Sequence, residues 1–244
     1  MERRWGAGVF IKDSDGAYRS TLFSELAWAE HGFGTRRCPD GLGGPRIATL
    51  RQVHSDVALW VTDVSGCAGE ADALVTNSPG QRVAVRTADC LPLLFAARRR
   101  RAVAAVHAGW RGTAAGIAEK TVRKLSDAFD ADPAELLVAI GPGIGVCCYR
   151  VGPDVAARFR GLLPHLPEHV FVHVDLAEAN RRQLRRAGVP DAQIDIAGMC
   201  TRCRAGEFFS HRHNPGETGR MRNVIGIVGG PDNAVRVETK RARA

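Results

Sequence analysis

The stretch Arg82–His107 reads RVAVRTADCLPLLFAARRRRAVAAVH. It contains three short, mostly apolar runs, Arg82–Arg86, Leu91–Ala96 and Ala102–His107, separated by polar residues and a basic turn. Such runs are typical of β-strands, and their nearly continuous apolar character indicates strands that are buried on both faces. This stretch therefore predicts the centre of a sheet that other layers cover.

The sequence on either side predicts further strands and the helices that pack on them. Strands are expected at Val57–Val61, Ala73–Thr76, Leu136–Ile140, Val170–Val174, Ile194–Ala197 and Val224–Val228. Helices are expected at residues 112–129, 153–163 and 175–186, the last capped by Asp175 and ended by Gly188. Because strands and helices do not alternate strictly, we predict an α/β (α+β) fold, a single layered domain over residues 1–244 with a mixed β-sheet and packed helices.

The composition is that of an ordinary globular protein, with 45% hydrophobic and 25% charged residues. No apolar run approaches the roughly 18 residues that span a bilayer, and the N-terminus lacks a secretory signal, so we expect a cytoplasmic protein that does not bind membranes. The net charge of +8 favours anionic partners. The aromatic fraction is only 6%, however, and no basic run alternates with aromatic residues, which argues against nucleic acid as a partner.

The seven cysteines are an odd number in a chain too large to need disulfides, which favours free thiols or metal ligands. Cys200-x-x-Cys203, followed by His211 and His213, is compatible with a structural zinc site or a redox motif. The chain has no second Cys-x-x-Cys, so we interpret this pair as ordinary thiols in a loop.

Three residues beside predicted strands, His54, Cys90 and His107, could bind a metal ion. Two imidazoles and one thiolate suit an open catalytic zinc site, because zinc takes nitrogen and sulfur ligands and a catalytic site leaves one position for water. The three residues lie far apart in the sequence, and no local motif forces them together. Taken singly, each also fits a plain structural role: a hydrogen-bonded histidine at a strand end, or a buried cysteine.

Seven short motifs, in one order over about residues 31–228, are similar to those of a known family. They are Gln52-Val53-His54, Ala71-Asp72-Ala73 with Thr76-Asn77, Thr87-Ala88-Asp89-Cys90-Leu91-Pro92, His107-Ala108-Gly109-Trp110-Arg111-Gly112, Ile140-Gly141-Pro142, Cys148-Tyr149 with Val151-Gly152, and Phe208-Phe209-Ser210 with Thr218-Gly219-Arg220. On these motifs the chain resembles the laccase-domain family, also called multicopper polyphenol oxidases. The resemblance implies a single mixed α/β domain in which His54, Cys90 and His107 are the metal ligands.

Members of this family are zinc-dependent purine nucleoside phosphorylases, and some bacterial ones are called peptidoglycan editing factors. The resemblance therefore implies phosphorolysis of adenosine, inosine, guanosine and methylthioadenosine, with an accompanying adenosine deaminase activity. The expected cofactor is zinc, with copper as the alternative, and the expected partners are purine nucleosides and phosphate. The sequence predicts neither the preferred nucleoside nor the oligomeric state.

Three further residues are candidates for the chemistry. Asp89 could pass a proton to the ammonia that leaves in deamination. Arg111 and Arg36 could bind phosphate through paired, charge-assisted hydrogen bonds. The structural alternatives are a carboxylate that accepts backbone amides at a turn for Asp89, an ion pair at the start of a helix for Arg111, and a solvated side chain for Arg36.

The chain also departs from the family pattern. Residues 37–50 leave no room for the helix that usually precedes the Gln-Val-His strand, which affects substrate range if that segment shapes the nucleoside pocket. Arg150 stands where an acidic residue is common, and His211 where an aromatic residue is usual. Other interpretations are a copper-dependent polyphenol oxidase, a metal-free cysteine hydrolase with Cys90 as nucleophile and His107 as base, and a non-enzymatic anion-binding module.

Overall fold

The computed structural model describes residues 9–40, 43–44, 46–216 and 219–229. The first six residues, the basic run 240–243 and Thr218 of the last motif lie outside the described residues. None of the described helices combines the length and the hydropathy that a membrane crossing requires.

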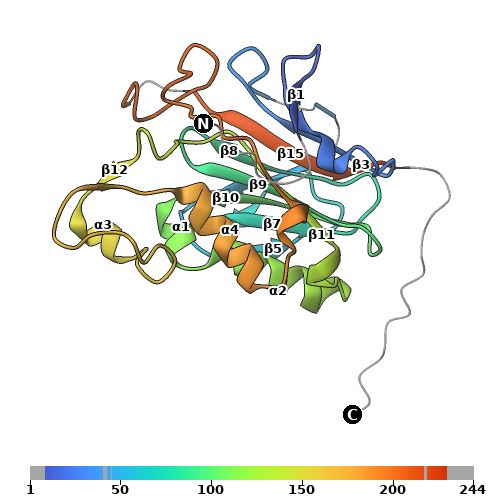
Figure 1. The fold of residues 1–244 in the computed structure, drawn as a ribbon. Coiled ribbons are helices and arrows are strands. Elements are labelled where there is room, and N and C mark those ends of the chain that lie inside the picture. The colour runs from blue at the N-terminus through green and yellow to red at the C-terminus, as the bar shows by residue number, and fades with distance from the viewer. Residues whose placement is uncertain (1–8, 41–42, 45, 217–218, 230–244) are drawn as a thin grey trace.

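Two large mixed sheets and a layer of helices stack on one another (Figure 1). Sheet A has the strand order β1 (Phe10–Lys12), β2 (Tyr18–Ser20), β3 (Ala29–Phe33), β15 (Met221–Ile227), β8 (Arg82–Thr87), β4 (Ile47–Arg51) and β6 (Gly66–Glu70). Sheet B has the order β14 (Ile194–Ile196), β11 (Leu136–Ile140), β9 (Leu91–Ala97), β10 (Ala102–Ala108), β7 (Ala73–Thr76) and β5 (Ala58–Trp60). The predicted mixed α/β class is confirmed, with two large sheets in place of the one expected.

The helices lie on the face of sheet B that points away from sheet A (Figure 1). They are α1 (Trp110–Ala114), α2 (Ile117–Phe129), α3 (Pro153–Ala157) and α4 (Leu176–Arg186). Short 3-10 turns occupy Thr21–Phe23, Pro133–Glu135 and Asp191–Gln193, and β12 (Arg150–Val151) pairs with β13 (Val172–His173).

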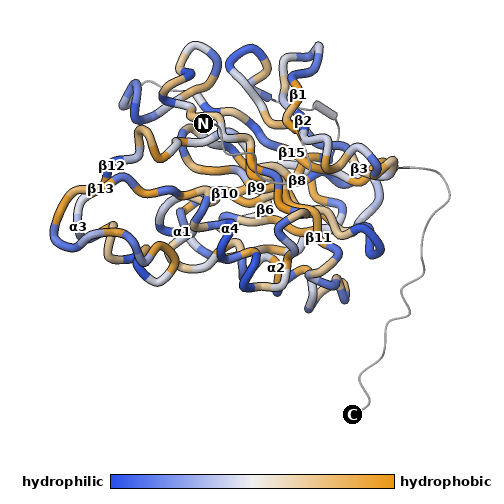
Figure 2. The backbone as a smooth tube through the Cα atoms, in the orientation of Figure 1, coloured by the Kyte–Doolittle hydropathy of each residue, from blue (hydrophilic) through white to orange (hydrophobic). Residues whose placement is uncertain are grey.

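Strands β9 and β10 are buried along their whole length, as the apolar runs predict. Successive side chains of a strand point to opposite faces, so each strand contributes to two cores. Leu94 packs into the core between the two sheets, whereas Leu93 and Phe95 pack into the core between sheet B and the helices. Figure 2 shows the resulting hydrophobic centre of the molecule.

Two predicted helices differ from the structure. The helix expected at 112–129 is split at Gly116, whose φ of +88° is a left-handed conformation that glycine adopts without steric penalty. The helix expected at 153–163 ends at Ala157, and turns follow it. The third prediction is confirmed, because the Asp175 carboxylate accepts the Glu178 N–H at 2.9 Å and caps α4.

The sequence prediction missed most of the outer strands. Strands β1–β4 and β6 are short and largely lack continuous apolar runs; β6, for example, reads GCAGE. The strand expected at residues 170–174 is reduced to Val172–His173. Burial on only one face leaves such strands without a strong sequence signal.

Candidate active site

Three polar side chains meet at one edge of sheet B because of its strand order. Cys90 directly precedes β9, His107 lies near the end of β10, and Asp72 directly precedes β7. Strand β10 pairs antiparallel with both neighbours, and its register sets His107 opposite Pro92 and next to the residue that pairs with Ala73. The end of β10 therefore lies between the beginnings of β9 and β7.

His54 reaches the same edge from the loop between β4 and β5. Strand β5 runs parallel to β7, so the loop that precedes it lies beside Asp72. The Asp72 carboxylate fixes this loop: it accepts the backbone N–H groups of Val53 at 3.2 Å and Ser55 at 2.5 Å, and the Ser55 hydroxyl at 2.8 Å. Between these anchors His54 adopts a left-handed φ of +60°.

The ligand atoms of His54, Cys90 and His107 lie within 4.8 Å of one another. The two imidazole rings meet edge to face with centroids 4.9 Å apart. A side chain at Gly109 would disturb this cluster, because a Cβ atom there would lie 3.0 Å from the Cys90 sulfur and 3.2 Å from the His54 ring. Two nitrogens and one sulfur at this spacing fit a single zinc-type ion with one coordination position left open.

A buried carboxylate orients His107. Its Nδ1 lies 2.7 Å from Asp72 Oδ1, which leaves Nε2 to face the cluster. A histidine that ligates a metal typically donates its other N–H to a carboxylate in this way. The role of Asp72 was not predicted from the sequence, where the one signal is a carboxylate between two alanines just before a buried strand.

The pKa values of the residues in and behind this cluster are strongly shifted. Burial opposes ionisation of the Cys90 thiol, but hydrogen bonds with His107 and His54 outweigh it and lower its pKa to about 6. Burial opposes protonation of His107, but hydrogen bonds with Asp72 and Cys90 raise its pKa to about 9. The pKa of Asp72 falls to about 2, because its bonds to His107 and Ser55 outweigh its burial. At neutral pH, without a metal ion, the protein thus holds a thiolate and a carboxylate around one protonated imidazole.

A cleft of about 860 Å³ opens beside these three side chains. Among the described residues, five arginines line it, against a single acidic residue, Asp89. The arginines are Arg86, Arg111, Arg150, Arg212 and Arg220. This concentration of positive charge favours an anionic ligand such as phosphate. Of these arginines only Arg111 is a phosphate-binding candidate from sequence, because the others lie on loops and strands that only the fold brings together.

Arg111 lies at the start of α1 with its guanidinium stacked over the Trp110 ring, 4.5 Å from the centroid. Among the described residues it has no acidic partner, so the ion pair considered as its structural role is not present there. Arg36 lies elsewhere: its Nε donates to the Phe208 carbonyl at 3.0 Å, and it is not among the residues that line the cleft.

Asp89 lines the cleft in a left-handed backbone conformation, with φ +86°. Both carboxylate oxygens are engaged. Oδ1 accepts the Thr201 hydroxyl at 2.7 Å, and Oδ2 accepts the backbone N–H of Arg212 at 2.6 Å. The carboxylate thereby holds two distant loops against the cleft, and a carboxylate has further lone pairs that can face a ligand.

Arg150 and His211, the two residues that depart from the family pattern, also line the cleft. Arg150 stacks on the Phe171 ring at 4.6 Å, and its carbonyl accepts from the Arg212 side chain at 3.1 Å. These departures therefore lie where they can affect ligand choice.

A family model and individual relatives both match most of this chain. Residues 35–228 match the family model described as multi-copper polyphenol oxidoreductase laccase. The chain is 40% identical over 211 residues to purine nucleoside phosphorylase YlmD of Geobacillus stearothermophilus, covering 78% of this chain and 76% of that protein. It is 38% identical over 182 residues to purine nucleoside phosphorylase YfiH of Escherichia coli, covering 73% of each.

Solved structures agree in fold. The crystal structure of YlmD from Geobacillus stearothermophilus superposes with a TM-score of 0.81 at 31% identity, covering 91% of this chain and 99% of that one. The Bacillus licheniformis hypothetical protein YfiH gives a TM-score of 0.78 at 27% identity, covering 89% and 98%.

Proposed function

The chain belongs to the multi-copper polyphenol oxidoreductase laccase family, and from that premise we propose that it is a zinc-dependent purine nucleoside phosphorylase with an accompanying adenosine deaminase activity. The observation that carries the proposal is the convergence of His54, Cys90 and His107 beside an arginine-lined cleft. The names of its relatives support the nucleoside and phosphate as substrates.

The cleft residues fit the needs of phosphorolysis. In this reaction the C1′–N9 bond of the nucleoside breaks, a phosphate oxygen bonds to C1′, and the purine leaves with the electron pair and takes up a proton. We assign Arg111 to the phosphate, because it lines the cleft and has no acidic partner among the described residues. The other cleft arginines would add to the positive potential that holds this anion.

Two aromatic residues of the cleft, Trp110 and Tyr149, offer surfaces for the purine. Burial raises the pKa of the Tyr149 phenol, so its hydroxyl stays protonated at neutral pH and can donate a hydrogen bond. The cleft volume of about 860 Å³ falls within the usual range for small-molecule sites.

His54, Cys90 and His107 are the residues that would hold zinc, with Asp72 orienting His107. When bound, zinc would supply a Lewis acid and lower the pKa of a coordinated water. For deamination, in which water replaces the amino group of adenosine and ammonia leaves, we assign to Asp89 the transfer of a proton to the departing amine.

The test is an assay of base release from inosine and adenosine with and without inorganic phosphate. We expect free purine and ribose 1-phosphate only when phosphate is present, and inosine from adenosine in either case. His107→Ala should reduce both activities by at least about 100-fold, because it removes a metal ligand. His169→Ala, at an exposed histidine outside the cleft, is the matched control and should retain activity.

Base release that is independent of phosphate, or equal turnover by His107→Ala, would refute the assignment. The ligand set alone does not decide between zinc and copper, since both accept these ligands and copper generally binds more tightly. Metal analysis of the active protein distinguishes them. An oxidised phenol substrate and a copper-dependent colour would instead favour a polyphenol oxidase.

One observation favours a second candidate. Cys90, His107 and Asp72 form a hydrogen-bonded series of thiol, imidazole and carboxylate, as in a cysteine hydrolase. This arrangement does not explain why His54 also faces the same sulfur. Loss of activity on alkylation of Cys90 in fully active, metal-free protein would support the hydrolase.

A further inference from the structure

A second group of metal-ligating side chains lies outside the proposed active site. The sulfur atoms of Cys147, Cys148, Cys200 and Cys203 all lie within 4.8 Å of one another. We call these residues the four-thiol cluster. They come from two loops, and neither His211 nor His213, which follow the Cys200-x-x-Cys203 motif, takes part in the cluster.

Strand pairing explains why these cysteines meet. Strands β11 and β14 run parallel and next to each other, so the loops that follow them leave sheet B at the same edge. The loop after β11 carries Cys147 and Cys148, and the loop after β14 carries Cys200 and Cys203. A parallel bridge between Gly143 and Cys200 continues the pairing into the loops.

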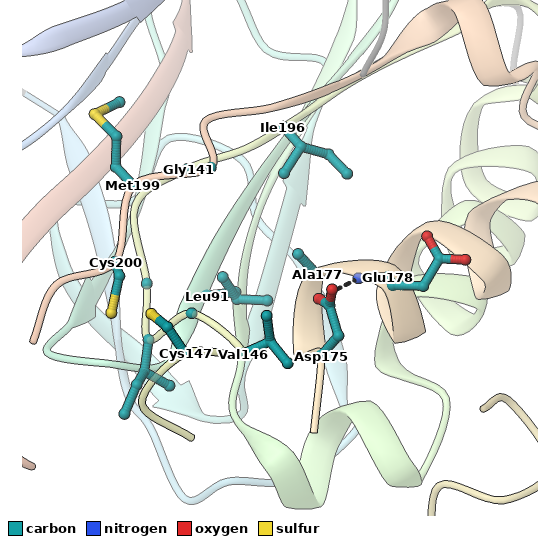
Figure 3. A pocket seen from close by; sticks show the side chains of 14 residues that line it. Leu91, Gly141, Val146, Cys147, Asp175, Ala177, Glu178, Ile196, Met199 and Cys200 are labelled. Atoms are coloured by element: carbon teal, nitrogen blue, oxygen red, sulfur yellow. Dashed lines mark hydrogen bonds between the residues drawn. The ribbon is translucent and has the colours of Figure 1, made fainter. Parts of the chain in front are cut away.

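The two loops approach closely at Gly145. A Cβ atom there would lie 3.1 Å from the Cys200 Cβ and 3.2 Å from the Cys147 sulfur. In Figure 3 the Cys147 and Cys200 side chains lie side by side at one end of a small pocket.

We propose that the four-thiol cluster binds one zinc ion as a structural site, separate from the ion of the active site. The sulfurs of a tetrahedral zinc site with four thiolates lie about 3.8 Å apart, given zinc–sulfur bonds of about 2.3 Å. The Cys203 sulfur lies 3.5 Å from that of Cys147 and 3.4 Å from that of Cys148, close to this value. Four ligands complete the coordination of zinc, so this ion has no open position for substrate.

The distances between the sulfur atoms argue against disulfides and against an iron–sulfur cluster. Two disulfides would pair the sulfurs, whereas Cys203 is nearly equidistant from two partners. A single ion draws four thiolates to one centre, whereas an iron–sulfur cluster spreads them around several iron atoms. All four sulfurs within 4.8 Å of one another fit the single ion.

The ion would hold in place the loops that line the cleft. Cys148 directly precedes Tyr149 and Arg150, both of which line it. Cys200 directly precedes Thr201, whose hydroxyl bonds to Asp89. Zinc binding to the deprotonated thiols thus couples the two loops to the geometry of the proposed active site, without contact with the reacting atoms.

The experiment measures zinc in purified, reduced protein after gel filtration. We expect about two zinc ions per wild-type chain, about one in His107→Ala, about one in Cys203→Ser, and almost none in the double variant. Cys67→Ser, at an exposed cysteine outside both clusters, is the matched control and should keep about two. The zinc left in His107→Ala should show X-ray absorption typical of four sulfur ligands.

Absence of zinc from folded His107→Ala, or equal zinc in that variant with and without Cys203→Ser, would overturn the proposal. So would disulfides among these cysteines in the wild-type protein as purified without reductant, seen as the loss of two hydrogen atoms per bond in its mass. If Cys203→Ser does not fold, X-ray absorption of the wild-type protein decides. A mean of more than about two sulfurs per zinc supports the second site, and a mean near one refutes it.

Discussion

The His54, Cys90 and His107 cluster and the four-thiol cluster lie along the same edge of sheet B and differ in almost every other respect. The first has mixed nitrogen and sulfur ligands, a buried carboxylate behind one of them and a cleft in front. The second has only sulfur ligands, supplied by two paired loops. An incomplete ligand set beside a cleft suits catalysis, and a complete set between loops suits structure.

The comparison also shows how one strand order can produce two sites. Along the edge, β14 and β11 end beside the four-thiol cluster, and Cys90, His107 and Asp72 lie at the ends of β9, β10 and β7. Strand β9 is the neighbour of β11, so Cys90 is on the side of its cluster that faces the four thiols, and the adjacent Asp89 connects to that second cluster through Thr201. A disturbance of the four-thiol cluster should therefore reach the active site weakly, through positioning.

The largest difference in zinc binding between the two clusters should appear when Asp72 is substituted. We expect Asp72→Asn to weaken zinc binding at the active site by about 10- to 100-fold, because the amide no longer fixes the imidazole as a carboxylate does. Within the described part of the chain no carboxylate orients a ligand of the four-thiol cluster, and its zinc should be retained. Chelator competition measures both ions. Asp195→Asn, at another buried carboxylate of sheet B, is the control, and an equal loss there would show a general effect of folding.

Much of the fold could be predicted from the sequence, because buried strands such as β9 and β10 have continuous apolar runs. The outer strands could not, since exposure on one face removes that signal. The three candidate metal ligands followed from family motifs, whereas Asp72 needed the register of β7 and β10. The sequence contains no second Cys-x-x-Cys motif that would indicate a four-cysteine site. Only the parallel pairing of β11 with β14 showed that Cys147 and Cys148, which are neighbours in the sequence, lie beside the Cys200-x-x-Cys203 motif.

A smaller effect should separate phosphate binding from metal binding. Arg111→Ala should raise the KM for phosphate by about tenfold, because it removes a charge-assisted hydrogen bond to the anion. Both zinc ions should remain. Steady-state kinetics at varied phosphate measures the change, with Arg99→Ala, an exposed arginine bound to Glu135, as control. An unchanged KM for phosphate would assign that role to other arginines of the cleft.

The last effect concerns stability, and it involves a buried histidine outside both clusters. Burial lowers the pKa of His31 to about 4, and its Nε2 accepts the Ser20 N–H at 2.9 Å. Between pH 6.5 and about 4 the unfolded chain binds a proton that the native protein does not, so stability falls as the pH falls through this window, by roughly 3 kcal/mol at most. His31→Gln keeps an acceptor without this titration.

Denaturation at several pH values measures the difference between wild type and His31→Gln. The variant should lose less stability from pH 6.5 to 4 than the wild type. Parallel curves for the two proteins would show that His31 is protonated as easily in the native state as in the unfolded chain.

The most direct test of the account is turnover and zinc content measured on the same preparations of His107→Ala and Cys203→Ser. We expect His107→Ala to lose phosphate-dependent base release and to keep the zinc of the four-thiol cluster, and Cys203→Ser to lose that zinc and to retain turnover within a few-fold. Activity that survives in His107→Ala and disappears in Cys203→Ser would contradict it.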